Sequence, residues 1–158
     1  MNQTFVVRKA VERDQPGILH CLAEAFESYR QQYTPDAFLD TVLTPAGLEA
    51  RFGSMTIFVA VGPDGEVAGT IGYRLVNAAQ GHIRGMAVLP KCRGSGVAQQ
   101  LLDAVQDELR ARGCQRATLN TTKPLERAVS FYRRNGFQPT GGMKDFFGMP
   151  LYEYEKGL

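Results

Sequence analysis

Apolar positions along the chain follow two periods, which together predict alternating strands and helices. Short runs that are alternately or continuously apolar predict strands at residues 5–8, 56–61, 66–76, 82–89, 116–119 and 149–155. Apolar residues spaced three and four apart predict helices at 15–29, from 35 until Thr44-Pro45, at 97–112 and at 124–134. A short helical turn is expected at 48–52. With one further strand after the turn at Asn135-Gly136, the order is β-α-α-β-β-β-α-β-α-β-β.

Two of the predicted helices carry one apolar face each, which indicates that they pack on a sheet. These faces consist of Ile18, Leu22, Ala25 and Phe26 in the first helix, and of Leu101, Leu102, Val105 and Leu109 in the helix at 97–112. Asp14 stands where it could cap the first helix. Gly113 follows the later helix, where a left-handed residue is favoured. Pro63-Asp64-Gly65 predicts the turn of a hairpin.

Length and composition predict one cytoplasmic domain spanning residues 1–158. With 158 residues, 44% of them hydrophobic and 22% charged, the chain is long enough to bury a core. A net charge of +2 without a block of Lys or Arg argues against nucleic acid as a partner. No apolar run approaches the roughly 20 residues of a membrane span, and the N-terminus lacks a signal-peptide pattern. The three cysteines and two histidines have no metal-ligand spacing, so no metal is expected.

The most informative segment is Arg93-Gly94-Ser95-Gly96-Val97-Ala98, between a predicted strand and a predicted helix. Glycine has no Cβ, so the backbone can approach a ligand closely. The start of a helix presents unpaired N–H groups with partial positive charge, and such a turn binds phosphate. Lys91 and Arg93 add full charges. The segment therefore predicts an anion site, with a diphosphate as the expected ligand.

The spacing of the glycines separates this segment from two common phosphate-binding motifs. A P-loop needs Gly-x-x-x-x-Gly-Lys-Ser/Thr, and a dinucleotide fingerprint needs Gly or Ala at position 99, where this chain has Gln99. The pattern Arg-x-x-Gly-x-Ala after Met86-Ala87-Val88-Leu89-Pro90 instead resembles the pyrophosphate loop of the GNAT superfamily of acyl-CoA-dependent N-acetyltransferases. Residues 128–137 resemble the later helix–turn–strand signature of that superfamily.

This resemblance implies a fold, an activity and a cosubstrate. The fold is α/β (α+β), a single GNAT-like domain with a central, twisted, mixed and mostly antiparallel sheet flanked by helices. The activity is transfer of an acetyl group from acetyl-CoA directly to an amine of a small molecule, amino acid, peptide or protein. A non-catalytic acyl-CoA-binding regulatory module is the alternative, because Arg84 replaces a glutamate that several relatives carry. An exposed C-terminal strand could pair with a second copy in a homodimer.

The resemblance also implies which residues hold acetyl-CoA. Residues 93–98 bind the diphosphate. Gly85 predicts a bulge in the preceding strand, and by analogy the main chain of Met86 and Val88 contacts the pantetheine arm and the acyl oxygen. The side chains of Met86 and Val88 are expected in the core. Leu125 stands where relatives often have an asparagine that contacts the cofactor, and Asn120 is a candidate to replace it.

Two residues are candidates for moving protons. Tyr132 stands where many relatives place a tyrosine near the CoA sulfur, and it is the expected general acid. It also shares an apolar helix face, so the alternative is that Tyr132 only packs. No glutamate marks the general base. His82 has an unperturbed pKa of about 6.5, which suits a proton acceptor, whereas the alternatives are a structural histidine and a water relay.

The acceptor site is marked less clearly. Arg84 shares a strand face with His82 if the alternation holds, and it could bind a carboxylate or phosphate of the acceptor. Its alternative is a solvated or salt-bridged strand residue. Tyr29 and Tyr33 lie in segments that flank the acceptor in similar folds, although aromatic residues at helical spacing often form core. Cys92 has no histidine partner in sequence, so we interpret it as incidental.

Overall fold

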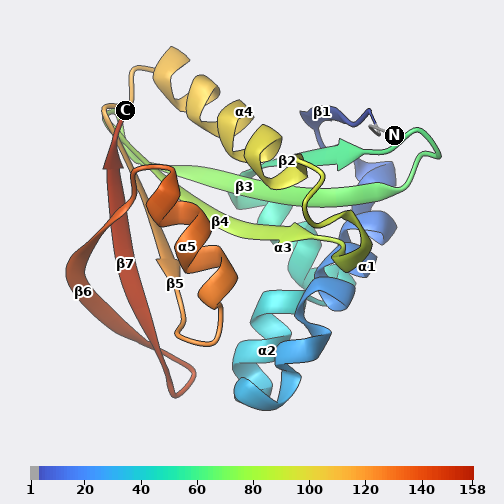
Figure 1. The fold of residues 1–158 in the computed structure, drawn as a ribbon, viewed down its shortest axis with the longest axis horizontal. Coiled ribbons are helices and arrows are strands. Elements are labelled where there is room, and N and C mark those ends of the chain that lie inside the picture. The colour runs from blue at the N-terminus through green and yellow to red at the C-terminus, as the bar shows by residue number, and fades with distance from the viewer. Residues whose placement is uncertain (1–3) are drawn as a thin grey trace.

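The structure, a computed structural model, describes residues 4–158, and one mixed sheet forms its centre (Figure 1). Within these residues seven strands follow the order β1-β2-β3-β4-β5-β7-β6. They are β1 (Val6–Lys9), β2 (Thr56–Val61), β3 (Val67–Asn77), β4 (Gln80–Val88), β5 (Arg116–Thr121), β6 (Gln138–Phe146) and β7 (Met149–Gly157). β4 and β5 are parallel, and the other neighbours are antiparallel. The expected mixed, mostly antiparallel sheet is confirmed.

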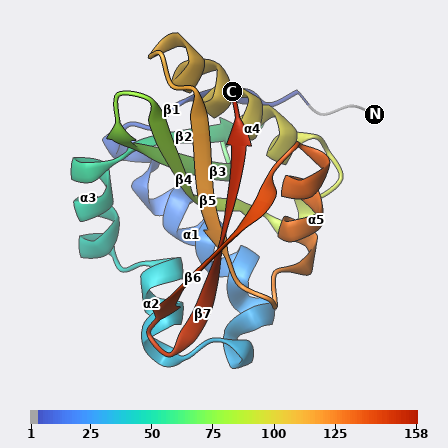
Figure 2. The ribbon, with the colours of Figure 1, turned by 90° about the vertical axis from the view of Figure 1, so that its left-hand side faces the viewer.

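Helices cover both faces of the sheet (Figure 2). They are α1 (Gln15–Phe26), α2 (Pro35–Val42), α3 (Pro45–Ser54), α4 (Val97–Ala111) and α5 (Glu126–Arg134), and a 3₁₀ segment, Glu27–Gln32, continues α1. The first three lie on one side of the sheet, and α4 and α5 lie on the other. Among residues 4–158, no helix is long and apolar enough to cross a membrane.

α4 lies directly on the sheet because facing positions of β3 and β4 are glycines. A Cβ atom at Gly69 would lie 2.7 Å from Cγ1 of Val97, and one at Gly81 would lie 2.5 Å from Cδ2 of Leu109. Any larger residue would push the helix outward. The predicted apolar face of α4 is buried in full: Leu101, Leu102, Val105 and Leu109. This packing fixes the start of α4 beside the end of β4.

β4 and β5 pair along only part of their length. Their parallel register runs from Gln80–Arg116 to Ile83–Leu119 and stops there. β4 then continues beside β3, while β5 continues beside β7, so the two strands diverge (Figure 1). Gly85 lies just past the last pair, with φ of 75° and a shift of the β3–β4 register beside it. The predicted bulge is confirmed.

The structure corrects the role predicted for Asp14. Its side chain makes no capping hydrogen bond to α1. The carboxylate instead accepts two bonds from Arg8, at 2.7 and 3.0 Å, and one from the N–H of Val11 at 2.8 Å. Because an ionised guanidinium donates in parallel to both carboxylate oxygens, Asp14 ties the end of β1 to the start of α1.

Several predicted helix boundaries were also wrong. The helix expected at 15–29 ends at Phe26, where the chain tightens into the 3₁₀ segment. The turn expected at 48–52 belongs to a complete helix, α3, because the Thr44 hydroxyl accepts the N–H of Gly47 and starts a new helix there. The helix expected from residue 124 begins at Glu126.

Candidate active site

A cavity of about 930 Å³ occupies the space where β4 and β5 diverge. Its walls are formed by parts of the strands β3, β4 and β5, the helices α1, α2, α3 and α5, the 3₁₀ segment, the start of α4 and the β6–β7 hairpin. The volume is in the range of a binding site for a sizeable organic ligand. Of the site residues predicted from sequence, these line it: Tyr29, Tyr33, His82, Arg84, Met86, Val88, Arg93, Gly94, Gly96, Val97, Ala98, Asn120 and Tyr132.

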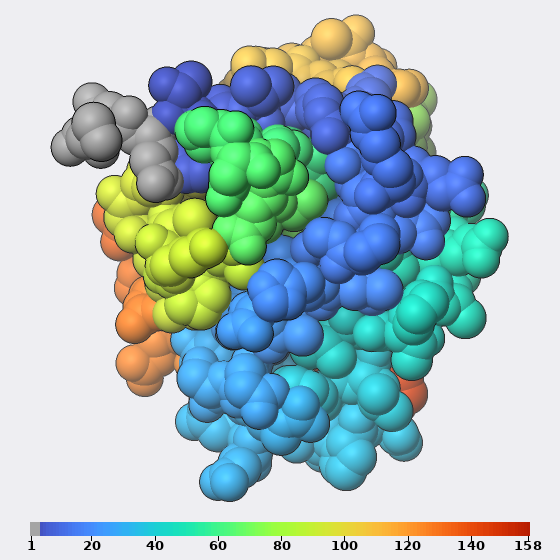
Figure 3. Space-filling model, turned by 90° about the vertical axis from the view of Figure 1, so that its right-hand side faces the viewer, coloured from blue at the N-terminus to red at the C-terminus, as the bar shows by residue number. Residues whose placement is uncertain are grey.

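Residues 93–98 form the expected tight turn before α4, and we call them the glycine turn. Gly94 and Gly96 have φ of 80° and 89°, a conformation that glycine adopts without strain. A Cβ at either position would meet no atom within 4 Å, so this side of the turn is open. Gly96 also leaves α4 without a side-chain cap. The turn therefore presents uncapped N–H groups and the positive end of the helix dipole. In Figure 3 the yellow-green turn lies at the surface beside α1 (blue).

The charges around the glycine turn differ from those predicted. Lys91 pairs with Glu66 at 2.6 Å, away from the cavity lining. Ser95 is not among the lining residues either, because its N–H and its hydroxyl both donate to the carbonyl of Cys92. Arg93 lines the cavity, and its Nη2 donates to the carbonyl of Ala25 at 3.4 Å. Two further cations come from α5, Arg127 and Arg134.

Beyond Ile83, the edge of β4 that faces β5 has no strand beside it. The N–H of Leu89 donates to the carbonyl of Ala68 on β3. Because successive N–H groups of a strand point to opposite edges, those of Val88 and Met86 point away from β3, toward the gap. Both side chains are half-buried and pack against the core, as expected. This part of β4 therefore offers free backbone donors to the cavity.

Tyr132 occupies the wall that α5 contributes to the cavity. Its ring packs edge-on against Phe131 and Phe137, with centroids 5.5 and 5.7 Å away. The side chain is buried, and burial raises the pKa of the phenol. The hydroxyl therefore keeps its proton at neutral pH. Tyr132 is both a packing residue and a protonated group at the cavity wall, so the two alternatives from the sequence are not exclusive.

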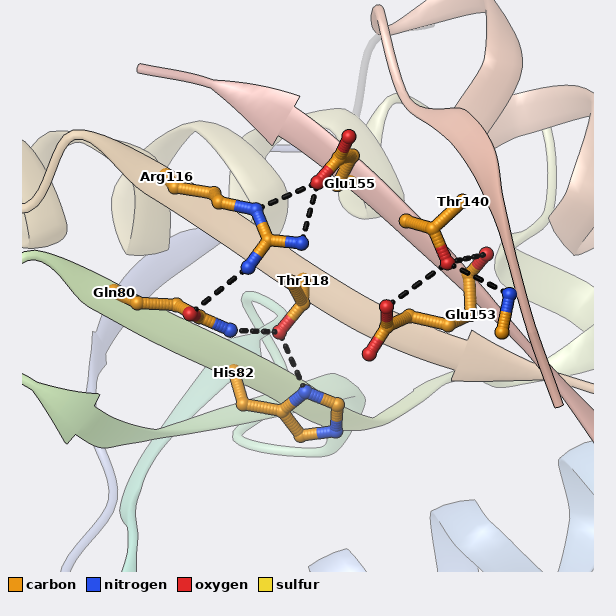
Figure 4. A network of polar contacts seen from close by, with 8 residues as sticks. Gln80, His82, Arg116, Thr118, Thr140, Glu153 and Glu155 are labelled. Carbon is orange, nitrogen blue, oxygen red and sulfur yellow. Dashed lines mark hydrogen bonds and ion pairs between the residues drawn. The ribbon is translucent and has the colours of Figure 1, made fainter. Parts of the chain in front are cut away.

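His82 belongs to a polar network (Figure 4). The network lies on the face of the sheet opposite α4, because the preceding residue of β4, Gly81, faces Leu109 of α4. Nδ1 of His82 lies 2.8 Å from Oγ1 of Thr118, and its Nε2 lies 3.4 Å from the amide nitrogen of Asn120. Since that amide nitrogen donates, Nε2 is the acceptor, and Nδ1 carries the proton that it donates to Thr118. Gln80 also donates to Thr118, at 3.2 Å, and Gln80 in turn accepts from Arg116 at 2.9 Å.

The surroundings of His82 keep it neutral. Burial lowers the pKa of His82 to about 4, and nearby positive charges contribute. These charges belong to Arg74, Lys144 and Arg84, whereas Glu153 acts in the opposite direction. At neutral pH the imidazole therefore has an unprotonated Nε2, which can accept a proton.

We call the part of the cavity lined by Asp40, Arg51, His82 and Arg84 the far end, because it lies along β4 away from the glycine turn. Arg84 reaches the cavity, as the strand alternation predicted, but it forms an ion pair with Asp40 of α2. The salt-bridged alternative from the sequence is therefore present in the structure. The Arg84 charge is partly neutralised by this partner.

The two tyrosines expected near the acceptor differ in exposure. Tyr33 is buried and packs edge-on against Phe26 and Phe38, and its hydroxyl lies 3.4 Å from Oγ1 of Thr122. Tyr29 is half-buried and packs against Phe26 with centroids 6.3 Å apart. Both side chains line the cavity, and Tyr33 also belongs to the core.

Cys92 lines the cavity as well, but its thiol is not activated as a nucleophile. Burial raises the pKa of this thiol. A raised pKa disfavours the thiolate, which is the nucleophilic form. The interpretation of Cys92 as incidental agrees with this.

Sequence reasoning missed several charged residues that line the cavity. They come from helices and strands far apart in the chain: Asp40, Arg51, Arg74, Arg127, Arg134, Lys144 and Asp145. Lys144 and Asp145 stand on β6, for which no range was predicted. The others stand on predicted elements, yet the pattern of one element does not show which neighbour its polar face meets. A lone arginine on a short helix, such as Arg51, looks like any solvated charge.

Comparison with known proteins agrees with this geometry. Residues 16–137 match the model of the acetyltransferase (GNAT) family. An aminoglycoside N(6')-acetyltransferase type 1 from Stenotrophomonas maltophilia is 34% identical over 137 residues, which cover 82% of this chain and 88% of that protein. N-alpha-acetyltransferase 30 from Schizosaccharomyces pombe is 40% identical over 58 residues, which cover 37% of this chain and only 39% of that protein.

A solved structure shares the fold over nearly the whole chain. The PaiA N-acetyltransferase from Thermoplasma acidophilum, in complex with coenzyme A, superposes with a TM-score of 0.80 at 16% identity, covering 98% of this chain and 99% of that one. The family match includes β4, the glycine turn and α5, which together form the cavity. This chain is a member of the GNAT family of acetyltransferases.

Proposed function

We propose that the protein transfers an acetyl group from acetyl-CoA to the nitrogen of an amine acceptor inside the cavity between β4 and β5. One observation carries the proposal: the glycine turn, a strand edge with no neighbouring strand, a neutral histidine and a protonated tyrosine line the same cavity. Each of these features supplies one requirement of acyl transfer, namely cosubstrate binding, carbonyl polarisation, proton removal and protonation of the leaving thiolate.

The glycine turn fits the diphosphate of acetyl-CoA. Gly94 and Gly96 leave their surface open, and the start of α4 adds partial positive charge. Arg93 belongs to the turn, lines the cavity and supplies a full charge. An extended chain with amide groups can add to a free strand edge through main-chain hydrogen bonds. The N–H groups of Met86 and Val88 would hold the pantetheine arm and the acyl oxygen in this way, and Asn120 lines the same wall.

The reaction is a direct displacement. The amine nitrogen attacks the carbonyl carbon of the thioester, forming a C–N bond, and the C–S bond then breaks. Nε2 of His82 takes the proton that the nitrogen loses, directly or through one water, and later releases it to solvent. Tyr132 gives its phenolic proton to the departing thiolate and regains one from solvent. Atoms and charge balance, with CoASH and the N-acetylated amine as products.

The environments of the two groups suit these roles. Tyr132 is protonated before the reaction because burial raises the pKa of its phenol. A thiol has a reference pKa of about 8.5, below that of the phenol. Tyr132 can therefore give its proton only to a thiolate that has just formed beside it. His82 is unprotonated because burial and positive neighbours lower its pKa to about 4. It can therefore accept a proton from the acidic, positively charged nitrogen of the tetrahedral intermediate.

The test is release of CoASH from acetyl-CoA by the purified protein over a panel of amines. The panel includes amino acids, their carboxamides, peptides, alkyl amines and an aminoglycoside, with a reaction without amine as the control. Turnover that depends on the amine is the expected result. If calorimetry shows tight acetyl-CoA binding while no amine in the panel supports turnover, the protein binds acyl-CoA without catalysis, and the proposal is wrong.

A further inference from the structure

The far end of the cavity carries an excess of positive charge. The basic residues that line it and the adjoining β6 wall are Arg51, Arg74, Arg84 and Lys144, against two carboxylates, Asp40 and Asp145. Both carboxylates already accept a bond from the protein. Arg84 donates to Asp40, and the backbone N–H of Gly148 donates to Asp145 at 3.3 Å. A concave surface with this balance attracts anions and repels cations.

Arg51 is the half-buried cation of this region, whereas Arg74, Arg84 and Lys144 are exposed. Arg51 lies on α3, and its Nη2 donates to the backbone carbonyl of Asp40 at 3.2 Å. No other hydrogen bond or ion pair to Arg51 occurs within residues 4–158. A guanidinium has five N–H donors, and a half-buried one with a single partner is underused. Its Nη1 lies against the bulge, 2.9 Å from where a Cβ of Gly85 would stand.

The position of Gly85 shows what Arg51 would reach. Gly85 belongs to the strand segment that also carries His82 and Met86. The Arg51 side chain therefore meets the cavity between the proposed proton acceptor and the backbone donors proposed for the acyl group. The φ of 75° favours glycine there, and a Cβ would displace the flexible end of the Arg51 side chain from its place against the bulge.

We propose that the acceptor is an amine that also carries a carboxylate or phosphate, and that Arg51 binds this anionic group. The inference rests on the function proposed above and specifies its acceptor. A guanidinium matches both anions through parallel N–H donors. Arg84, the residue that the sequence offered for this role, instead forms the ion pair with Asp40, and the described residues show no ion pair between Asp40 and Arg51.

The positive charges around His82 also favour an anionic acceptor. Without an acceptor, positive neighbours hold the pKa of His82 below its ordinary value, in addition to the effect of burial. Those neighbours include Arg84, which also lowers the pKa of Arg51. An anion bound at Arg51 would offset this field and make His82 a stronger proton acceptor. A polycationic acceptor would have the opposite effect. Although one relative is named an aminoglycoside acetyltransferase, the far end of this cavity therefore disfavours such a substrate.

The first test uses the wild-type protein and matched acceptors. Each pair has the same amine with and without the anion: an amino acid and its carboxamide, or an aminoalkyl phosphate and the corresponding amino alcohol. We expect kcat/KM to be about 10- to 100-fold higher for the anionic member, the worth of one charge-assisted hydrogen bond. The comparison of the two pairs separates carboxylate from phosphate. Equal values within both pairs, or a better rate with an aminoglycoside, would overturn the inference and leave the proposed function standing.

The second test assigns the preference to Arg51. Arg51→Gln should abolish most of the preference for anionic acceptors, while the KM for acetyl-CoA and the rate with carboxamides change little. Arg51→Lys keeps the charge and should retain part of the preference. Arg110→Gln is the control, since Arg110 lies on α4 and pairs with Asp107 at 3.5 Å. If Arg51→Gln lowers kcat/KM equally for anionic and neutral acceptors, Arg51 only supports the fold.

Failure of the proposed function has a different signature. In that case no amine of either kind is acetylated although acetyl-CoA binds, and the inference falls with it. If Arg51→Gln does not fold, the wild-type comparison of matched acceptors still decides the matter. Succinate, as an anion without an amine, supplies an independent measurement with CoA bound. It should inhibit the wild type competitively against the acceptor, and the absence of inhibition would contradict an anion site at the far end.

Discussion

Oγ1 of Thr118 lies 2.8 Å from Nδ1 of His82, across the parallel pair of β4 and β5. The contact occurs within the short stretch where these strands still pair, one position before they diverge. It holds the imidazole by its protonated nitrogen (Figure 4), while Nε2, the proposed proton acceptor, has only the longer contact of 3.4 Å with the amide of Asn120. Thr118 is thus the residue that orients His82, and in the proposed mechanism it acts as a positioning residue.

Replacing Thr118 tests this role. Thr118→Val removes the acceptor of the Nδ1 proton but keeps the shape of the side chain, so kcat should fall about tenfold or more, with little change in the KM for acetyl-CoA. Thr118→Ser should restore most of the loss because it restores the hydroxyl. Thr140→Val is the control, since the Thr140 hydroxyl bonds Glu153 at 2.9 Å in the same face of the sheet. Equal effects of the Thr118 and Thr140 valine variants would show that the loss reflects the sheet and not His82.

The low pKa of His82 predicts a pH dependence of stability. As the pH falls, His82 of the unfolded chain binds a proton near its pKa of about 6.5, whereas His82 of the folded protein binds one only near its pKa of about 4. The stabilising contribution of neutral His82 is therefore complete above pH 6.5 and is lost as the pH falls toward 4. The loss is at most about 3 kcal/mol in the free energy of unfolding.

Urea unfolding at pH 7 and pH 4.5 measures this contribution. The wild type should lose more stability between the two pH values than His82→Asn, because the carboxylates titrate in both proteins and cancel. The variant should be less stable at pH 7, since it loses the bond to Thr118. Parallel curves for the two proteins would mean that His82 keeps an ordinary pKa in the folded state.

Tyr132→Phe should remove the proposed acid and keep the ring. The aromatic contacts with Phe131 and Phe137 remain, so the melting temperature should change little. We expect kcat to fall on the order of 10²–10⁴-fold, as for other general acids. Tyr154→Phe is the matched control, because Tyr154 is also buried but does not line the cavity. Activity near the wild-type value in Tyr132→Phe would assign Tyr132 to packing alone.

Two glycines with the same backbone conformation test the glycine turn. Gly96 and Gly113 stand at opposite ends of α4 with φ of 89° and 88°, and a Cβ at either would meet no atom within 4 Å. Gly96→Asp and Gly113→Asp should both lose about 1–2 kcal/mol from the left-handed backbone, and Gly113→Asp should lose somewhat more, because its carboxylate stands at the negative end of the helix dipole. Calorimetry should show acetyl-CoA affinity reduced at least about tenfold in Gly96→Asp and unchanged in Gly113→Asp, because only the first carboxylate faces the diphosphate. Similar affinities in the two variants would place the cosubstrate elsewhere.

The sequence predicted the parts of the site that depend on local structure. The glycine turn, the bulge at Gly85 and the order of the elements each follow from a few neighbouring residues and from the family resemblance. Tyr132 and His82 line one cavity because β4 is one of the two diverging strands and α5 forms a wall of the gap between them. A φ above zero or a break in alternation is visible in the residue types themselves.

The far end could not be predicted in this way. The pairing of Arg84 with Asp40 joins residues 44 positions apart, and it depends on how α2 packs beside the sheet. Arg51 reaches Gly85 only because α3 is a complete helix, where the sequence indicated a short turn. Lys91 was expected at the diphosphate and instead pairs with Glu66. Charged side chains are long, and their partners follow from tertiary packing.

The central claim is that the cavity joins acetyl-CoA and an amine in one direct transfer. Mass spectrometry of a reaction of the wild-type protein, with acetyl-CoA and an amino acid that carries a free carboxylate, tests it most directly. The account predicts one N-acetylated product for each CoASH released, with the acetyl group on the acceptor nitrogen. Release of CoASH with free acetate and without the N-acetylated product would contradict it, because the thioester would then be cleaved by water and not by an amine.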